Sequence, residues 1–120
     1  MLNLFCNHPC NEKIPVGSWK SSQRGEYRTK DGRAYFTFNF VETGFFFTRY
    51  EIDIVSQPSY GSRPDGLHVT HRLTSNRGGY RICLGDESQA NSLSNARRWA
   101  AAWAECTWTY ICTGREFPNS

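Results

Sequence analysis

Several features that assign proteins to common classes are missing from this sequence. No run approaches the roughly 18 apolar residues that a membrane span requires, so we expect no transmembrane segment and no membrane partner. The phosphate-loop pattern GxxxxGK followed by Ser or Thr is absent, and no glycine-flanked nucleophile motif occurs. Internal repeats and low-complexity tracts are also lacking. These patterns therefore point to no nucleotide-binding loop, hydrolase or repeat architecture.

A strong charge of either sign is missing as well. Fourteen Lys and Arg stand against eleven Asp and Glu, which gives a formal net charge of +3. The excess is uneven, because residues 13–33 hold six cations and two anions, a net +4. This balance permits an acidic partner such as nucleic acid but does not require one.

Aromatic residues, by contrast, are abundant. The 120-residue chain has the length of one domain and holds eight Phe, six Tyr and four Trp. Each ring buries a large apolar area, so a few strands and one helix are enough for a dense core. Some rings are left over for contact with a partner.

The cysteines indicate a reducing compartment. There are five, an odd number, and no secretory signal precedes Cys6. We therefore expect free thiols and a cytoplasmic location.

We predict an α+β fold, an antiparallel β-meander of about four strands packed against one long C-terminal helix (ββββα). Residues 1–33 are expected to be an irregular basic arm, because Pro and Gly are scattered among polar residues. Residues 34–114 make up the predicted domain, and residues 115–120 a tail. Alternating apolar residues and turn signals place the strands at residues 34–40, 45–55, 67–74 and 80–84.

Alternation along a strand also predicts which face each side chain occupies. Phe36, Phe38 and Phe40 share one face of the first strand, and Tyr80 is expected to point inward from the last. In the second strand, Arg49, Glu51 and Asp53 share a face that we expect to be solvated.

The helix has the clearest local signals. Ser92 or Ser94 can cap its N-terminus, and Gly114 suits the position just past its end. At 100° per residue, Trp99 and Trp103 fall on an apolar arc that should cover the aromatic face of the sheet. Trp108 lies off this arc.

A zinc site is a weak alternative. Cys6, His8 and Cys10 resemble half of such a site, but a closed structural site needs four ligands. No second Cys or His cluster exists, and His68 and His71 are expected on opposite faces of a strand. No metal or other cofactor is therefore favoured, and the cluster is interpreted as unpaired thiols, with a Cys6–Cys10 disulfide as a lesser alternative.

No residue is predicted to be catalytic. Cys83 and His68 can be neighbours on paired strands, but a catalytic pair would also need a third group to orient the base, and no sequence context here matches a nucleophile motif. A cysteine on a strand is more often a small apolar filler. We therefore do not expect an enzyme.

A basic surface is one functional hint. Strand arginines with nearby tyrosines suit nucleic acid, because cations contact phosphates and rings stack on bases. Glu51 and Asp53 interrupt the predicted patch. The candidate nucleic-acid contacts lie in the basic arm, on the strands and at the helix start: Lys20, Arg24, Arg28, Lys30, Arg33, Arg49, Arg72, Arg77, Arg81, Arg97 and Arg98.

The segments GGYRICL and SNARRWAAA resemble the C-terminal half of a double-stranded-RNA-binding domain. In such domains the last strand runs into a helix with a basic, alanine-rich start. The resemblance covers residues 67–113 only. The first helix of those domains is missing and the strand lengths differ, so the chain is not assigned to that family.

The surplus of rings is the second hint, and it points to a protein partner. Phe45 and Phe47 belong to a run of three phenylalanines that places rings on both faces, and Trp108 lies off the helix arc. Exposed apolar clusters mark interfaces. We therefore predict a small non-catalytic module that binds a protein or forms a homodimer. The alternatives are a nucleic-acid-binding accessory protein and a small zinc-stabilised domain.

Overall fold

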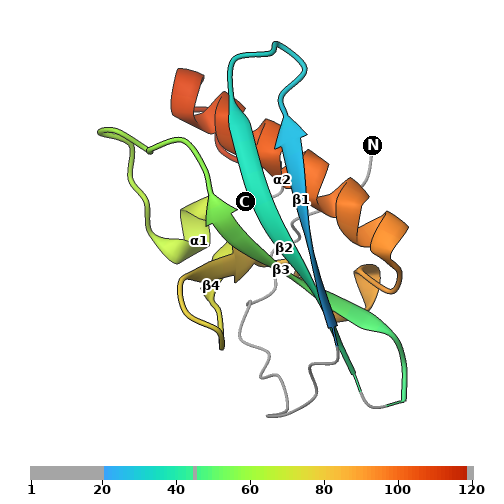
Figure 1. Cartoon of the computed structure of the whole chain (residues 1–120). Coiled ribbons are helices and arrows are strands. Elements are labelled where there is room, and N and C mark those ends of the chain that lie inside the picture. The colour runs from blue at the N-terminus through green and yellow to red at the C-terminus, as the bar shows by residue number, and fades with distance from the viewer. Residues whose placement is uncertain (1–20, 45, 119–120) are drawn as a thin grey trace.

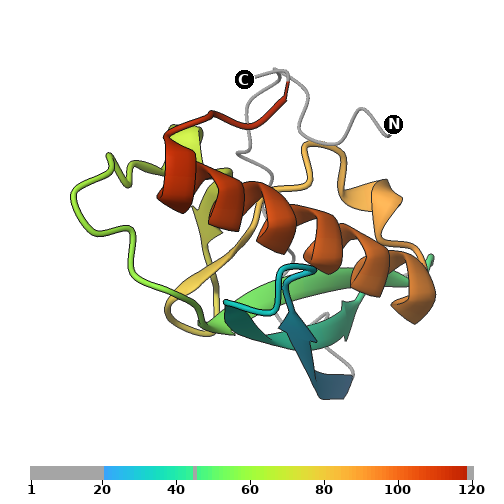
Figure 2. The same ribbon diagram turned by 90° about the horizontal axis from the view of Figure 1, so that it is seen from above.

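A computed structural model of the chain describes residues 21–44 and 46–118. One sheet forms the first layer, and the long helix α2 (Leu93–Thr113) lies across one face of it (Figures 1 and 2). This confirms the predicted α+β arrangement. The strands are β1 (Ser21–Arg28), β2 (Tyr35–Thr43), β3 (Arg49–Ser56), β4 (Arg72–Thr74) and β5 (Tyr80–Ile82). Two short helices, α1 (Leu67–Thr70) and the 3-10 helix η1 (Glu87–Gln89), complete the described elements.

The sheet has five antiparallel strands in the order β1-β2-β3-β5-β4. The predicted pairing of β2 with β3 and of β4 with β5 is right, but the sheet is not a continuous meander and contains β1 as a further strand. β5 pairs with β3, at Asp53 opposite Arg81 and Ile54 opposite Tyr80, and β4 forms the edge. The chain between β3 and β4 is long enough to carry β4 past the position that β5 then fills.

The core lies between the sheet and α2, as predicted. Phe36, Phe38 and Phe40 are buried, and the indole of Trp103 meets the first two rings edge-on. The ring centroids of Trp103 and Phe36 are 5.9 Å apart. Trp99 is buried on the same face of the helix.

The caps of α2 also follow the prediction. Ser92 Oγ accepts a hydrogen bond from the backbone N–H of Asn95 at 3.1 Å. Gly114 has φ of +80° and donates its N–H to the carbonyl of Tyr110 at 2.8 Å. No helix among residues 21–44 and 46–118 is both long and apolar enough to cross a membrane.

The first correction concerns residues 21–28, which we expected to be irregular and which form β1. This strand pairs with β2 over its whole length, from Ser21 opposite Glu42 to Arg28 opposite Tyr35. A tight turn joins the two strands, with Gly32 at φ of +75° and the N–H of Thr29 bonded to the carbonyl of Ala34 at 3.0 Å. An edge strand needs few apolar residues, so the polar sequence of β1 gave no pattern from which a strand could be predicted.

The second correction concerns residues 67–74, predicted as one strand. Leu67–Thr70 form α1, and only Arg72–Thr74 form β4. His71 separates the two with φ of +52°, so the side chains of His68 and His71 are not on opposite faces but stack at 6.3 Å between centroids. The strand predicted from residue 45 likewise begins later, at Arg49.

Candidate binding surfaces

The strand arginines do not form the basic face that the sequence suggested. Arg81 is 3 % exposed and Arg72 is 9 % exposed, and pairing puts them on opposite faces of the sheet. Arg72 pairs with Ile82, which belongs to the core, whereas Arg81 pairs with Asp53 on the face away from α2. Their charges are therefore enclosed by the protein.

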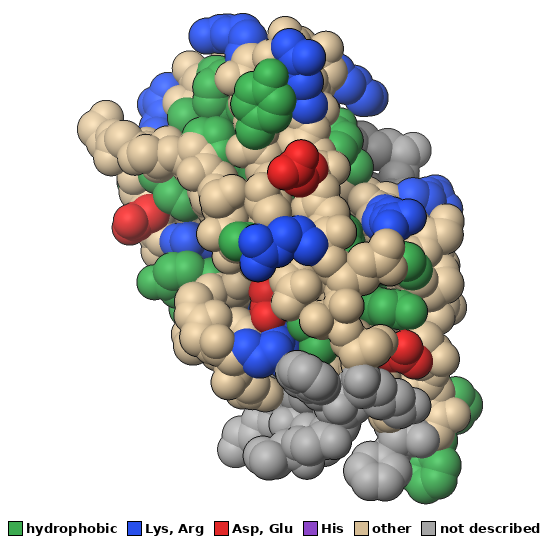
Figure 3. All heavy atoms as spheres, viewed as in Figure 1, with side chains coloured by type: hydrophobic (Ala, Val, Ile, Leu, Met, Phe, Trp, Pro, Cys, Tyr) green, Lys and Arg blue, Asp and Glu red, His purple; other side chains and the backbone are tan. Residues whose placement is uncertain are grey.

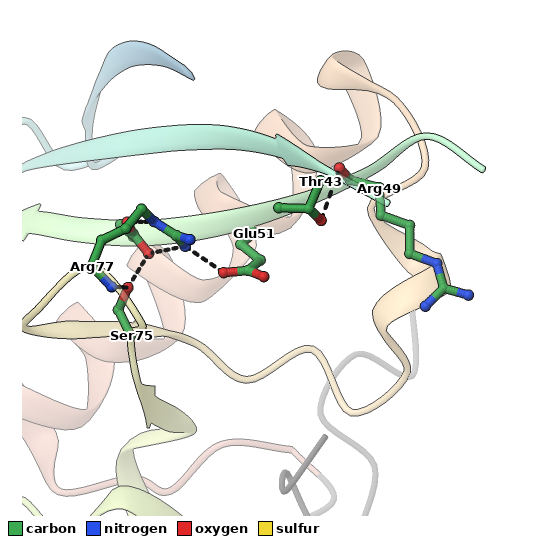
Figure 4. A network of polar contacts seen from close by, with 6 residues as sticks. Thr43, Arg49, Glu51, Ser75 and Arg77 are labelled. Carbon is green, nitrogen blue, oxygen red and sulfur yellow. Dashed lines mark hydrogen bonds and ion pairs between the residues drawn. The ribbon is translucent and has the colours of Figure 1, made fainter. Parts of the chain in front are cut away.

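Arg77 is also used internally. From the hairpin after β4 it reaches back over β3, where its Nε lies 2.6 Å from Asp53 Oδ2 and its Nη2 bonds Glu51 Oε1 (Figure 4). Ser75 Oγ donates to Asp53 Oδ1 at 2.9 Å. Glu51 is 1 % exposed, so the face that we expected to be solvated is covered here. Arg49 points its guanidinium away from this network (Figure 4).

Three exposed cations lie at the turn between β1 and β2. Figure 3 shows Lys and Arg side chains around an exposed hydrophobic group at that end of the molecule. Arg28, Lys30 and Arg33 are exposed there, and the guanidinium of Arg28 lies 5.3 Å from the ring centroid of Tyr35. We call Arg28, Lys30 and Arg33 the basic turn. The other exposed candidates among the described residues lie elsewhere: Arg24, Arg49, Arg97 and Arg98.

Trp108 proves to be a contact within the molecule. Its indole N–H donates to Asp31 Oδ2 at 2.7 Å, and Arg33 lies 5.6 Å over its ring. Bonds from the backbone N–H of Arg33, from Thr29 and from Trp108 hold the pKa of Asp31 below its usual range. Trp108, which lies off the apolar arc of the helix, therefore attaches the β1–β2 turn to α2.

Glu105 makes the second contact between that turn and α2. Its carboxylate accepts from Tyr27 Oη and from the backbone N–H of Lys30, the latter at 2.9 Å. Burial, with the bond to Glu105 and its charge, raises the pKa of Tyr27 to about 12.

The connection between β2 and β3 carries the most exposed rings. Phe46 is 89 % exposed and Phe47 is 72 % exposed. Gly44, at φ of +107°, starts this connection, and an added Cβ would lie 2.1 Å from the carbonyl oxygen of Phe47. The chain can therefore take this turn only with glycine, which fixes where the two rings are presented. Phe45, the first ring of the run, lies outside the described residues.

A cavity of about 480 Å³ opens beside β5, and the sequence did not predict it. Arg72 lies in its wall between two rings, 4.9 Å from the centroid of Tyr60 and 4.2 Å from that of Tyr80. Tyr80 is not inward as predicted but exposed. Arg72 and Tyr80 flank one hairpin and become diagonal neighbours once its register is fixed. The sequence does not give this register, so the cavity wall could not be predicted from it.

His71 is enclosed beside the C-terminal tail. Its ring stacks on Phe117 at 4.6 Å and on His68, and its carbonyl accepts from the N–H of Cys83 at 2.9 Å. Burial, with the nearby charge of His68, lowers the pKa of His71 to about 4. The neutral imidazole is therefore the form that the fold holds.

We expect stability to fall as the pH is lowered from about 6.5 to about 4, by about 2 to 3 kcal/mol from His71. Between these pH values the unfolded chain, with the ordinary histidine pKa, binds a proton at His71 and the folded chain does not. The contribution of His71 to the free energy of unfolding is therefore complete above pH 6.5 and is lost as the pH falls. Urea unfolding at several pH values measures it. In His71→Asn, which tolerates the positive φ, most of this pH dependence should vanish; an unchanged profile would assign it to other groups.

The cysteines depart from the expectation of free thiols. Cys106 and Cys112 are free, but Cys83 is buried and disulfide-bonded, with its partner outside the described residues. Burial, with the charge of Glu105, raises the pKa of Cys106, which makes it a poor nucleophile at neutral pH.

The other predicted site residues are not brought together. Arg97 and Arg98 are exposed on the first turns of α2, and Arg24 is exposed on β1. Cys6, His8, Cys10 and Lys20 lie outside the described residues. Within the described part of the chain, no group of three His, Cys, Asp or Glu is placed to hold a metal ion.

The chain matches no protein-family model, no curated protein and no solved structure.

Proposed function

We propose that the protein is a small non-catalytic module that binds another protein, and that a second copy of the chain is the partner its exposed rings fit best. The observation that carries this is the exposure of Phe46 and Phe47, 89 % and 72 %, on a turn held by Gly44. Large exposed rings are costly in water and are the residue type that anchors interfaces. An all-Phe patch is complementary to itself, as a two-fold interface requires.

The electrostatics support a protein partner over nucleic acid. Arg72 and Arg81 are buried, and Arg77 is ion-paired with Glu51 and Asp53. Affinity for nucleic acid comes mostly from cations that can reach phosphates. A net charge of +3 also leaves only weak repulsion between two copies.

Phe47→Ser should weaken the self-association by about tenfold or more, because an anchoring ring is lost from the centre of the interface. Light scattering after size exclusion, over a concentration series, measures the dissociation constant. Tyr35→Ser is the matched control, since Tyr35 is another exposed ring at the opposite end of β2. A wild-type chain that stays monomeric throughout, or an equal effect of both substitutions, would refute the proposal.

A nucleic-acid-binding accessory protein remains the second candidate, and the basic turn favours it. Arg28, Lys30 and Arg33 are exposed at this turn, and Arg28 lies 5.3 Å from the ring centroid of the exposed Tyr35, so cations for phosphates lie beside a ring on which a base can stack. Binding to duplex and single-stranded oligonucleotides at two salt concentrations tests it, because phosphate contacts must weaken steeply with salt. Neutralising these three cations together should then abolish the binding.

We also propose that the protein is not an enzyme and holds no cofactor. A small zinc-stabilised domain is the third candidate function. Metal analysis of the full chain purified without added zinc tests the cluster of Cys6, His8 and Cys10. The cytoplasmic location is not supported by the disulfide at Cys83, since disulfides persist mainly in oxidising compartments.

A further inference from the structure

Arg72 has more hydrogen-bonding capacity than the protein uses. Its Nε donates to Thr70 Oγ1 at 2.9 Å and its Nη2 to the carbonyl of Asp65 at 2.8 Å. A guanidinium has five N–H groups, so three have no hydrogen-bond partner among the described residues. The ion pairs within the described part of the chain involve Arg77, not Arg72. A charge that is 91 % buried is therefore held without an opposite charge against it.

Two further polar groups, Tyr60 Oη and Gln57 Oε1, are buried in the same cavity and have no well-formed hydrogen bond to a described residue. The side chains of Gln57 and Thr70 nevertheless lie close enough to the phenol to lower its pKa against the effect of burial. Burial raises the pKa of Tyr60, so its phenol stays protonated and can donate. Buried polar groups without a well-formed hydrogen bond are uncommon in proteins and call for a ligand or water. Two donors, Arg72 and Tyr60, thus line one opening.

We propose that this cavity binds a carboxylate of a polypeptide partner, with Arg72 and Tyr60 donating to its oxygens. The inference rests on the proposed function, because it names the group that a protein partner would insert. Two parallel N–H donors of an arginine match the two oxygens of a carboxylate. Ile54, Val55 and Pro58 also line the cavity and offer apolar contact for the residue that carries the carboxylate.

The charge of the cavity favours a carboxylate over a phosphate. Arg72 is the one cation among the lining residues, and Asp65 adds a carboxylate to the same wall. Asp65 repels either anion, but a phosphate dianion carries twice the charge of a carboxylate, so it is repelled more strongly and is only half neutralised by Arg72. Nucleic-acid surfaces in addition need several cations in a row.

The test is an NMR titration of the isotope-labelled full chain. N-acetyl-leucine supplies a carboxylate on an apolar residue, and N-acetyl-leucine amide is its neutral match. The acid should produce saturable shifts at residues 55–61 and Tyr80, with the amide binding about tenfold more weakly or worse, since charge-assisted hydrogen bonds are lost. Equal binding of the two, or no shifts with the acid, would overturn the proposal. Shifts with inorganic phosphate but not with the acid would overturn it in favour of a phosphate site.

Variants separate the charge from the fold. Arg72→Met should abolish the shifts, but its burial makes misfolding a risk. Val55→Trp is therefore the second variant: Val55 is exposed at the wall of the cavity, so a larger ring fills the opening and leaves Arg72 in place. Arg98→Met removes one exposed cation elsewhere and should bind like wild type. Undiminished binding by folded Val55→Trp would contradict the proposed position.

These outcomes are independent of the self-association measured with Phe47→Ser. If the acid does not bind but Phe47→Ser still weakens the dimer, only the carboxylate site falls. If the acid binds and the chain is monomeric, the proposal of a second copy as partner falls and a foreign acidic partner remains.

Discussion

Replacing Trp103 by alanine should lower the free energy of unfolding by about 4 kcal/mol. The indole is 0 % exposed and fills the space between α2 and β2, edge-on to Phe36 and Phe38. Removing it loses the transfer of a large ring from water and leaves a cavity that the rigid sheet cannot close. The indole N–H also donates to the carbonyl of Thr70 at 3.1 Å, so α1 loses an anchor. Urea unfolding followed by circular dichroism measures the change.

Trp103→Phe is the informative control for this substitution. It keeps most of the ring but loses the bond to Thr70, so we expect a loss of about 1 to 2 kcal/mol. Trp108→Phe, in a half-buried position, should cost less than Trp103→Ala. If the free energy of unfolding of Trp103→Ala were within about 1 kcal/mol of the wild-type value, the described packing of α2 on the sheet would be contradicted.

Elements whose signals lie within a few residues could be predicted from the sequence. The start of α2 is indicated by Ser92, its body by the alanine-rich stretch and its end by Gly114, all from local sequence. The tryptophans indicate which face of the helix is buried. In β2 the alternation of Phe36, Phe38 and Phe40 does the same for a strand. Their burial then follows from pairing the two apolar faces.

Elements defined by distant contacts could not be predicted. β1 has a polar sequence and exists because β2 offers it a complete set of hydrogen bonds. The turn at Leu67–Thr70 alternates like a strand, but it is closed by Thr70, which bonds the carbonyl of Gly66 through both its N–H and its hydroxyl. A period of two in a short segment does not distinguish these outcomes.

The candidate site was missed for the same reason. Arg72 was expected on a solvated face, but the register that places it beside Ile82 depends on the hairpin between β4 and β5. Tyr60 reaches it from the loop after β3, in a stretch of turn residues with no periodicity. Neither contact is encoded within a local window.

Replacing Arg77 by methionine should lower the free energy of unfolding by about 3 to 4 kcal/mol at neutral pH. Burial alone would lower the pKa of Arg77, but its hydrogen bonds to Asp53 and Glu51 and their charges raise it, so the guanidinium stays charged beside both carboxylates. Without the guanidinium, Glu51 remains 1 % exposed, and its Oε2 already has no hydrogen-bond partner among the described residues. A buried carboxylate left alone costs far more than the pair contributes.

A compensated variant tells an unpaired charge from lost packing. Arg77→Met combined with Glu51→Gln and Asp53→Asn removes all three charges and keeps the side-chain volumes. Ser75 can still donate to the residue at position 53. We expect this triple variant to recover more than half of the stability lost in Arg77→Met, because a neutral replacement of a buried ion pair is often tolerated. Chemical unfolding of the wild type, Arg77→Met and the triple variant measures this. If the triple variant is no more stable than Arg77→Met, the hairpin is held over β3 by its packing, and the ion pairs contribute little.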